Sequence, residues 1–144
     1  MAERGYAGKA MGWHYLRMAD RTYKTHFGRR TAANLKKYFY VIRPLCALAW
    51  LVQRGSLPPM NMSALLAGID LGAGVRRTID RLLVRKTHAS ELGTGKRLAT
   101  LDRWIEGELG AGEARCGALA AKTPILAEAE EYFRQMLDGV ESKS

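Results

Sequence analysis

The sequence predicts an all-α protein, a single helical bundle of about five to seven helices. Apolar residues recur at helical spacing, and no apolar/polar alternation is long enough for a sheet strand. The 144 residues suffice for one compact core, and the apolar (47%) and charged (26%) fractions are those of a globular chain. We expect one helical domain over residues 1–122, with a C-terminal helix and a short frayed tail over 123–144 packing on it.

The first predicted helix covers about Ala7 to Phe27. Aromatic and aliphatic residues recur through it at helical spacing, and Gly28 with the two arginines after it closes the helix. Its buried stripe is expected to consist of Trp13, Leu16, Tyr23 and Phe27.

The second predicted helix begins near Thr31, an acceptable N-cap, and continues to about Gln53. Gly55 ends it, since glycine readily adopts the left-handed conformation that follows a helix. Pro44 should kink this helix, because a proline inside a helix removes one hydrogen bond and clashes with the preceding turn.

The middle of the chain is predicted to form a loop, a short helix and a longer helix. Pro58 and Pro59 enforce an extended path, and either Asn61 or Ser63 caps the short helix. The longer helix spans roughly Val75 to Thr87. Its buried side is expected to consist of Val75, Ile79, Leu82 and Leu83.

The segment GTGKR, Gly93–Arg97, resembles a phosphate loop only superficially, because no Ser or Thr follows Lys96. It is predicted to be a turn and a helix start. The amphipathic helix after it is expected to bury Leu98, Leu101, Trp104, Ile105 and Leu109. A last helix begins with Thr123 as N-cap and Pro124 as first residue, and it stops at Gly139.

The formal net charge of +9 is the strongest compositional signal about function. It favours an acidic partner such as a nucleotide, a nucleic acid or an acidic protein surface, the alternative being a solvated basic surface without a ligand. On the predicted helix Val75–Thr87, Arg77, Arg81 and Arg85 follow one another at i, i+4 and i+8. These three arginines therefore form one basic stripe.

The segment KKYFYVIRPL, residues 36–45, places charged side chains inside an apolar run. In a helix, Lys36, Tyr40 and Arg43 lie along one side, and a guanidinium beside tyrosine rings can hold a phosphate and stack on a base. Arg43 needs a partner, because an unpaired charge in apolar surroundings is costly. Aromatic residues at helical spacing are also frequent core residues, and this second interpretation applies to Tyr38, Phe39 and Trp50.

Several kinds of site are not indicated. The fourteen acids include no Asp-x-Asp pair, so neither a metal site nor an acid-based catalytic site is expected. Cys46 and Cys116 are expected to be two buried thiols of a cytoplasmic protein rather than a disulfide or a zinc site. The longest apolar stretch, about Tyr38 to Val52, is shorter than the ~20 residues of a membrane span, and no signal peptide is visible, so no membrane partner is expected.

An Arg-x(4–6)-His spacing resembles the motif of HEPN-domain ribonucleases. In that motif the histidine acts as acid or base on the ribose hydroxyl, and the arginine steadies the phosphate. Arg81 with His88 and Arg21 with His26 fit the spacing, which an arginine-rich chain also produces by chance. A plainer interpretation of His88 is a helix-end residue near the negative end of the helix dipole. A HEPN-like ribonuclease that uses Arg81 and His88 is the alternative enzyme.

Three segments together resemble one family: MGWHYLRMA (11–19), LKKYFYVIRPLCALAWLVQRGSLPPM (35–60) and IDRLLVRK (79–86). They are similar to the C-terminal helical half of bacterial nucleotidyltransferases of the DNA polymerase β superfamily, in the branch associated with RNA repair. The resemblance implies that a cleft for nucleotide and acceptor is faced by Lys37, Tyr38, Arg43 and Lys86. With the two residues placed by helical spacing, the expected phosphate-binding set is Lys36, Lys37, Tyr38, Tyr40, Arg43 and Lys86.

In such enzymes a preceding α/β half carries a Gly-Ser motif for the triphosphate and an Asp-x-Asp pair for magnesium. Here Gly55-Ser56 is followed by Leu-Pro-Pro, and no Asp-x-Asp occurs. We therefore expect a nucleotide- or nucleic-acid-binding module without activity by itself, whether a fragment, one part of a split enzyme or a module that has lost catalysis. Magnesium and nucleoside triphosphate are expected only together with a separate catalytic domain. The third interpretation is a non-catalytic homodimer formed through leftover apolar surface.

Overall fold

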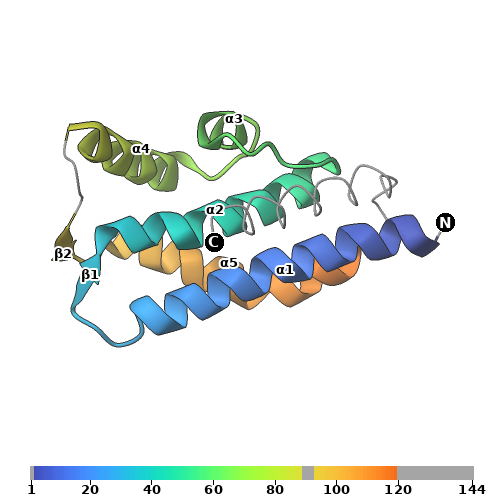
Figure 1. Cartoon of the computed structure of the whole chain (residues 1–144), viewed down its shortest axis with the longest axis horizontal. Helices are drawn as coiled ribbons and strands as arrows, with labels where there is room; N and C mark the ends of the chain where they lie inside the picture. The colour runs from blue at the N-terminus through green and yellow to red at the C-terminus, as the bar shows by residue number, and fades with distance from the viewer. Residues whose placement is uncertain (1, 89–92, 120–144) are drawn as a thin grey trace, which may run out of the picture.

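The computed structural model describes residues 2–88 and 93–119, and the side chains of 8–87 and 93–119. Within these residues, five helices and two short strands are present (Figure 1). They are α1 (Ala2–His26), β1 (Ala32–Asn34), α2 (Leu35–Arg54), α3 (Met62–Ala67), α4 (Ala73–His88), β2 (Thr94–Lys96) and α5 (Ala99–Leu119). The all-α prediction is confirmed. The helix predicted from Thr123, and with it the division at residue 122, lies outside the described residues.

The long helix α2 lies at the centre of the molecule. In Figure 1, α1 lies below α2, α5 lies behind the pair, and α3 and α4 lie above α2. The contacts between helices agree with this arrangement. Helix α1 contacts α2 and α5, α2 contacts α3 and α5, and α4 contacts α5. None of the described helices combines the length and the apolar character that a membrane crossing requires.

A two-stranded antiparallel sheet joins the two halves of the chain, with Ala33 opposite Gly95. The prediction that residues 93–97 form a turn and a helix start is therefore wrong for Thr94–Lys96, which form β2. Strands of three residues are too short to show an alternating pattern. Gly95 allows a close approach here, because a Cβ on it would lie 3.1 Å from Cδ1 of Leu35.

The start of α2 differs from the prediction, whereas its end agrees. Thr31 precedes β1, and the N-cap is Asn34, whose side-chain oxygen accepts a hydrogen bond from the Lys36 amide at 3.1 Å. Gly55 caps the C-terminus in the left-handed conformation, with φ of 66°. Pro44 lies inside α2 and is buried, and the helix continues past it to Arg54.

The core consists of two clusters of buried side chains. The main cluster joins the C-terminal half of α1, the N-terminal half of α2 and buried residues of α3, α4 and the start of α5; its largest fully buried members include Tyr38 and Phe27. The second cluster joins the other halves of α1, α2 and α5 around Leu16 and Leu51. Both cysteines are free and buried, as predicted.

The predicted buried positions are largely confirmed. The buried residues include Leu16, Tyr23, Phe27, Ile79, Leu82, Leu101 and Ile105. The other predicted positions are half-buried and pack against one of the two clusters: Trp13, Val75, Leu83, Leu98, Trp104 and Leu109. The short helix α3 is capped by Asn61, one of the two residues proposed for that place.

Candidate phosphate-binding surface

The first two turns of α2 present a basic surface. The side chain of Lys36 is exposed, that of Lys37 is half-buried, and Tyr40 is 46% exposed. The first turn of α2 contains no acidic residue, so nothing there offsets the positive end of the helix dipole. The start of α2 is therefore an electropositive part of the molecule.

Two lysines of this surface lie over aromatic rings. The Nζ atom of Lys37 is 4.7 Å from the ring centre of Tyr40, one turn further along α2. The Nζ atom of Lys86, near the end of α4, is 5.3 Å from the ring centre of Phe39. These cation–π contacts hold both ammonium groups near the start of α2, and the second brings α4 to the same place. We call Lys36, Lys37, Tyr40, Arg43 and Lys86 the α2/α4 basic surface.

Arg43 is exposed and has a partner that the sequence did not indicate. Its Nη1 atom donates a hydrogen bond to the backbone carbonyl of Met60 at 2.7 Å. This bond attaches the loop before α3 to α2. An arginine side chain carries five N–H donors, and among the described residues the Arg43 guanidinium makes no other side-chain hydrogen bond or ion pair, so it can donate to another acceptor as well.

The predicted basic stripe of α4 is on the outer face of that helix. Arg77, Arg81 and Arg85 are exposed, whereas Ile79 and Leu82 are buried. Among the described residues, no carboxylate lies within 4.0 Å of any of the three arginines. The stripe thus presents free positive charge on a different side of α4 from Lys86, which lies over Phe39 of α2.

Tyr38 is placed in the core and not on the surface. Its side chain is fully buried, and its hydroxyl donates to Asp102 Oδ1 at 3.0 Å and accepts from the Leu98 amide at 2.9 Å. Burial, with the nearby negative charge of Asp102, raises the pKa of Tyr38. The phenol is neutral and occupied, so Tyr38 positions the start of α2 and offers no group to a ligand in this structure.

A polar network around Arg97 was not indicated by the sequence. The guanidinium donates from Nε to Asp102 Oδ2 at 3.1 Å and from Nη2 to the Tyr23 hydroxyl at 3.0 Å. Its Nη1 atom donates, at 2.9 to 3.3 Å, to the backbone carbonyls of Phe27, Gly28 and Arg30. This network connects α1, the turn after it, β2 and α5. No local sequence pattern could reveal it, because the partners are up to 74 positions apart.

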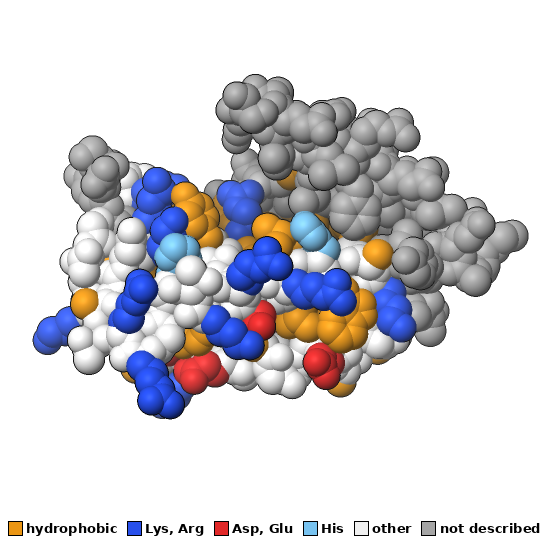
Figure 2. Space-filling view, turned by 60° about the horizontal axis from the view of Figure 1, so that its bottom comes forward, with side chains coloured by type: hydrophobic (Ala, Val, Ile, Leu, Met, Phe, Trp, Pro, Cys, Tyr) orange, Lys and Arg blue, Asp and Glu red, His pale blue; other side chains and the backbone are white. Residues whose placement is uncertain are grey.

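Basic charge is not confined to α2 and α4. Figure 2 shows the face on which α1 lies, where Lys and Arg side chains are spread widely and Asp and Glu side chains gather along the lower part. Arg17, Arg21 and Lys24 of α1 are all exposed. The positive net charge is therefore displayed on more than one face of the protein.

The structure does not test the pair Arg81 and His88, whose spacing is similar to that of HEPN ribonucleases. Arg81 is exposed on α4, and the side chain of His88 lies outside the described set. Arg21 is exposed on α1, and His26, at the end of the same helix, is half-buried.

Comparison with known families decides the relationship. The model of the RNA repair pathway DNA polymerase beta family matches residues 1–135. The chain belongs to this family. The resemblance found in the three sequence segments is thereby confirmed, and it extends beyond Lys86 to include α5.

A bacterial protein is similar in sequence to part of this chain. The protein is 32% identical over 101 residues to YcgL, an uncharacterized protein of Bacillus subtilis strain 168. The match covers 70% of this chain and 38% of YcgL, so the chain spans well under half of the length of that relative. No solved structure matches the chain.

Membership of the RNA repair pathway DNA polymerase beta family does not by itself assign ligands to residues. Among the described side chains, no group of three or more His, Cys, Asp or Glu residues is placed to hold a metal ion. The described residues of the α2/α4 basic surface supply cations and an aromatic ring, which can hold phosphates and stack on bases.

Proposed function

We propose that this protein is the phosphate-holding helical module of a polymerase-β-type nucleotidyltransferase, and that its α2/α4 basic surface binds the backbone of single-stranded RNA. Membership of the RNA repair pathway DNA polymerase beta family supports a nucleotidyltransferase relationship, and the name of that family supports RNA as the ligand. The observation that carries the proposal is the pair of lysines held over aromatic rings on two neighbouring helices.

The arrangement suits a single strand. Lys36, Lys37 and Lys86 supply charge around the start of α2, and Arg43 adds a planar guanidinium further along the helix. Tyr40 is nearly half exposed, so one part of its ring can contact an unpaired base while Lys37 lies over the ring. Cations that follow a backbone beside an aromatic platform are the usual means of binding single strands.

Catalysis is assigned to another domain. Nucleotidyl transfer in this superfamily requires an Asp-x-Asp pair for magnesium, and no Asp-x-Asp occurs in these 144 residues. We propose that magnesium and the nucleoside triphosphate are held mainly by a separate catalytic domain, and that this module closes over the RNA end and steadies the phosphates by electrostatic attraction.

Fluorescence anisotropy with a labelled single-stranded RNA, titrated at several salt concentrations, tests the proposal. Replacing Lys36, Lys37 and Lys86 together by alanine should weaken binding and reduce the salt dependence. For single strands each phosphate contact contributes about 0.7 to the slope of log K against log salt, so three lost contacts should lower the slope by about 2. The matched control replaces three exposed arginines elsewhere, Arg21, Arg29 and Arg103, and should change the slope less.

The same titration can contradict the proposal. Equal losses in both triple variants would mean that the RNA has no preferred surface, and no binding at 50 mM salt would remove RNA as the ligand. Tight binding of a nucleoside triphosphate that RNA does not displace, and that the Lys36/Lys37/Lys86 triple alanine variant loses, would make the nucleotide the ligand of this surface instead. The RNA is also examined on a gel after incubation, because cleavage lost in His88→Ala would favour the ribonuclease alternative.

A further inference from the structure

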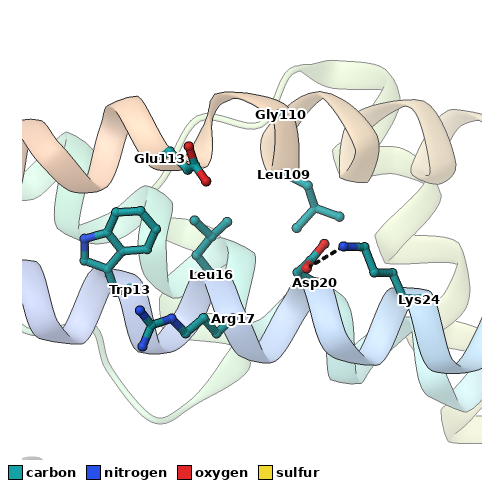
Figure 3. Close-up of a pocket in the computed structure, with 8 residues that line it drawn as sticks. All are labelled: Trp13, Leu16, Arg17, Asp20, Lys24, Leu109, Gly110 and Glu113. Atoms are coloured by element: carbon teal, nitrogen blue, oxygen red, sulfur yellow. Dashed lines mark ion pairs between the residues drawn. The ribbon is translucent and has the colours of Figure 1, made fainter.

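A cavity of about 510 Å³ lies between α1 and α5, away from the α2/α4 basic surface (Figure 3). In Figure 1, α1 and α4 lie on opposite sides of α2, so this cavity and the contact of Lys86 with Phe39 are on different sides of the molecule. Its volume is in the usual range of small-molecule sites, about 300 to 1,000 Å³. It is lined by Trp13, Leu16, Arg17, Asp20, Lys24, Leu109, Gly110 and Glu113.

Two glycines of α5 determine the shape of this cavity. A Cβ on Gly112 would lie 2.3 Å from Cδ1 of Leu16, so α5 and α1 are in close contact at that point. A Cβ on Gly110 would meet no other atom within 4 Å. The helices are thus held together at Gly112 while the wall beside Gly110 stays open, which makes the space a built feature of the helix packing.

The two ends of the cavity differ in chemistry. Figure 3 shows Trp13 and Glu113 at one end and the ion pair of Asp20 with Lys24, 3.0 Å apart, at the other. The guanidinium carbon of Arg17 is 5.7 Å from the centre of the Trp13 ring. For Glu113, no hydrogen bond or ion pair is found with any side chain that the structure describes. The cavity therefore combines an aromatic surface, two cations and two carboxylates: Asp20 is paired with Lys24, whereas Arg17 and Glu113 form no ion pair with the side chains that the structure describes.

We propose that this cavity binds a guanine nucleotide at the end formed by Trp13 and Glu113, with the base against these two residues and the phosphate at the guanidinium of Arg17, which lies beside Trp13 (Figure 3). An indole binds a planar base by stacking, and the guanidinium of Arg17 suits a phosphate, whereas Lys24 is already paired with Asp20. The carboxylate of Glu113 only accepts hydrogen bonds. This site shares no residue with the α2/α4 basic surface, so it does not depend on the proposed function.

The choice of guanine follows from the carboxylate of Glu113, which is a hydrogen-bond acceptor. The Watson–Crick edge of guanine carries two adjacent N–H donors, at N1 and the 2-amino group, which match the two oxygens of a carboxylate. Adenine and cytosine place a ring nitrogen acceptor beside their amino group, and that nitrogen would repel the carboxylate. Uracil has a single N–H between two carbonyl oxygens. Guanine is therefore the base that Glu113 accepts without repulsion.

Isothermal titration of the full chain with GMP and with AMP tests the proposal. We expect GMP to bind at least tenfold more tightly than AMP. Gly110→Leu should weaken GMP binding at least tenfold, because the new side chain enters the cavity. Gly107→Leu is the matched control: Gly107 lies on the same helix, its Cβ would also meet nothing within 4 Å, and it does not line the cavity. Leucine favours the helix more than glycine does, so both variants should fold.

A second variant tests the acceptor directly. Glu113→Gln keeps the shape of the side chain and replaces one acceptor oxygen by a donor, so the preference for GMP over AMP should fall severalfold. Because Glu113 is exposed, the melting temperature should not change. Equal affinity for GMP and AMP, no heat with millimolar GMP, or equal effects of the two leucine variants would each overturn the proposal. Loss of GMP binding in the Lys36/Lys37/Lys86 triple alanine variant would also overturn the proposal, because the nucleotide would then bind the α2/α4 basic surface. If that variant loses RNA binding but keeps GMP binding, the guanine nucleotide site is supported and is independent of RNA binding.

Discussion

The Tyr38 hydroxyl donates a hydrogen bond to the carboxylate of Asp102 at 3.0 Å, across 64 positions of the sequence. Through this bond the first turn of α5 fixes the first turn of α2, the segment that presents Lys36 and Lys37. Arg97 binds the other carboxylate oxygen of Asp102 at 3.1 Å, and so fastens the turn after α1 to the same point. The buried network thus positions the surface that we propose to bind RNA.

Asp102→Ala should lower the free energy of unfolding by about 3 kcal/mol. The side chains of Arg97 and Asp102 are only 18% and 14% exposed, and removing one partner of a buried ion pair leaves the other charge without compensation. The measurement is urea unfolding followed by circular dichroism. Asp80→Ala is the control, because Asp80 and its partner Arg76 are about half exposed, and such surface pairs contribute about 0–1 kcal/mol. A similar small loss in both variants would contradict the role of the network.

The stability of the protein should fall as the pH rises above about 10. Burial, together with the charges of Asp102 and Glu106, raises the pKa of Tyr23 above its usual value of 10.0, and burial also raises the pKa of Tyr38. Both phenols stay protonated in the folded protein after they ionise in the unfolded chain. Their contribution to stability is therefore complete below pH 10 and is lost as the pH rises toward the folded-state pKa values.

Urea unfolding midpoints between pH 8 and pH 11.5 measure this effect. Each tyrosine ionised only in the unfolded chain contributes a slope of about 1.4 kcal/mol per pH unit. The buried thiols act in the same direction, since burial raises the pKa of Cys46 to about 12. Comparison with Tyr23→Phe isolates the contribution of the Tyr23 phenol. Above pH 10 the free energy of unfolding of the variant should fall less steeply with pH than that of the parent chain, and an identical slope would contradict the prediction.

The helices could be predicted from the sequence because their signals are local. Gly55 and Asn61 mark helix ends by their own conformation and side chain, and the line of Lys36, Tyr40 and Arg43 follows from helical spacing alone. Nothing local signals an interaction between distant segments. Three features join residues more than forty positions apart: the pairing of the short strands, the contact of Lys86 with Phe39 and the hydrogen bond from Tyr38 to Asp102. Only the folded chain reveals them.

Gly112→Ala and Gly107→Ala should change stability in opposite directions. Both positions lie inside α5, where alanine is favoured over glycine by about 0.5–1 kcal/mol. At Gly107 the added methyl group meets nothing within 4 Å, so the variant should gain about that amount. At Gly112 the methyl group would lie 2.3 Å from Leu16, which is buried in the second core cluster, so overpacking should cost about 1–3 kcal/mol.

Thermal melting of the two variants beside the parent chain gives the comparison. The melting temperature should rise for Gly107→Ala and fall for Gly112→Ala. A rise in both would show that Leu16 moves aside freely, and then the close contact that borders the α1/α5 cavity would not be rigid.

Arg43→Ala should weaken both the fold and RNA binding, because its guanidinium has two tasks. The bond from Nη1 to the Met60 carbonyl, 2.7 Å long, attaches the loop before α3, and its loss should lower the free energy of unfolding by about 1 kcal/mol. The remaining N–H groups stay available to a phosphate, so the salt slope of RNA binding should also fall by about 0.7. Arg43→Lys separates the tasks: a lysine keeps the positive charge for the phosphate but lacks the planar fork of donors that reaches a carbonyl and a phosphate together. Its RNA salt slope should match the parent chain while its stability falls as in the alanine variant. If Arg43→Ala lost stability but kept the full salt slope, Arg43 would belong to the loop alone, and the α2/α4 basic surface would consist of its lysines and Tyr40.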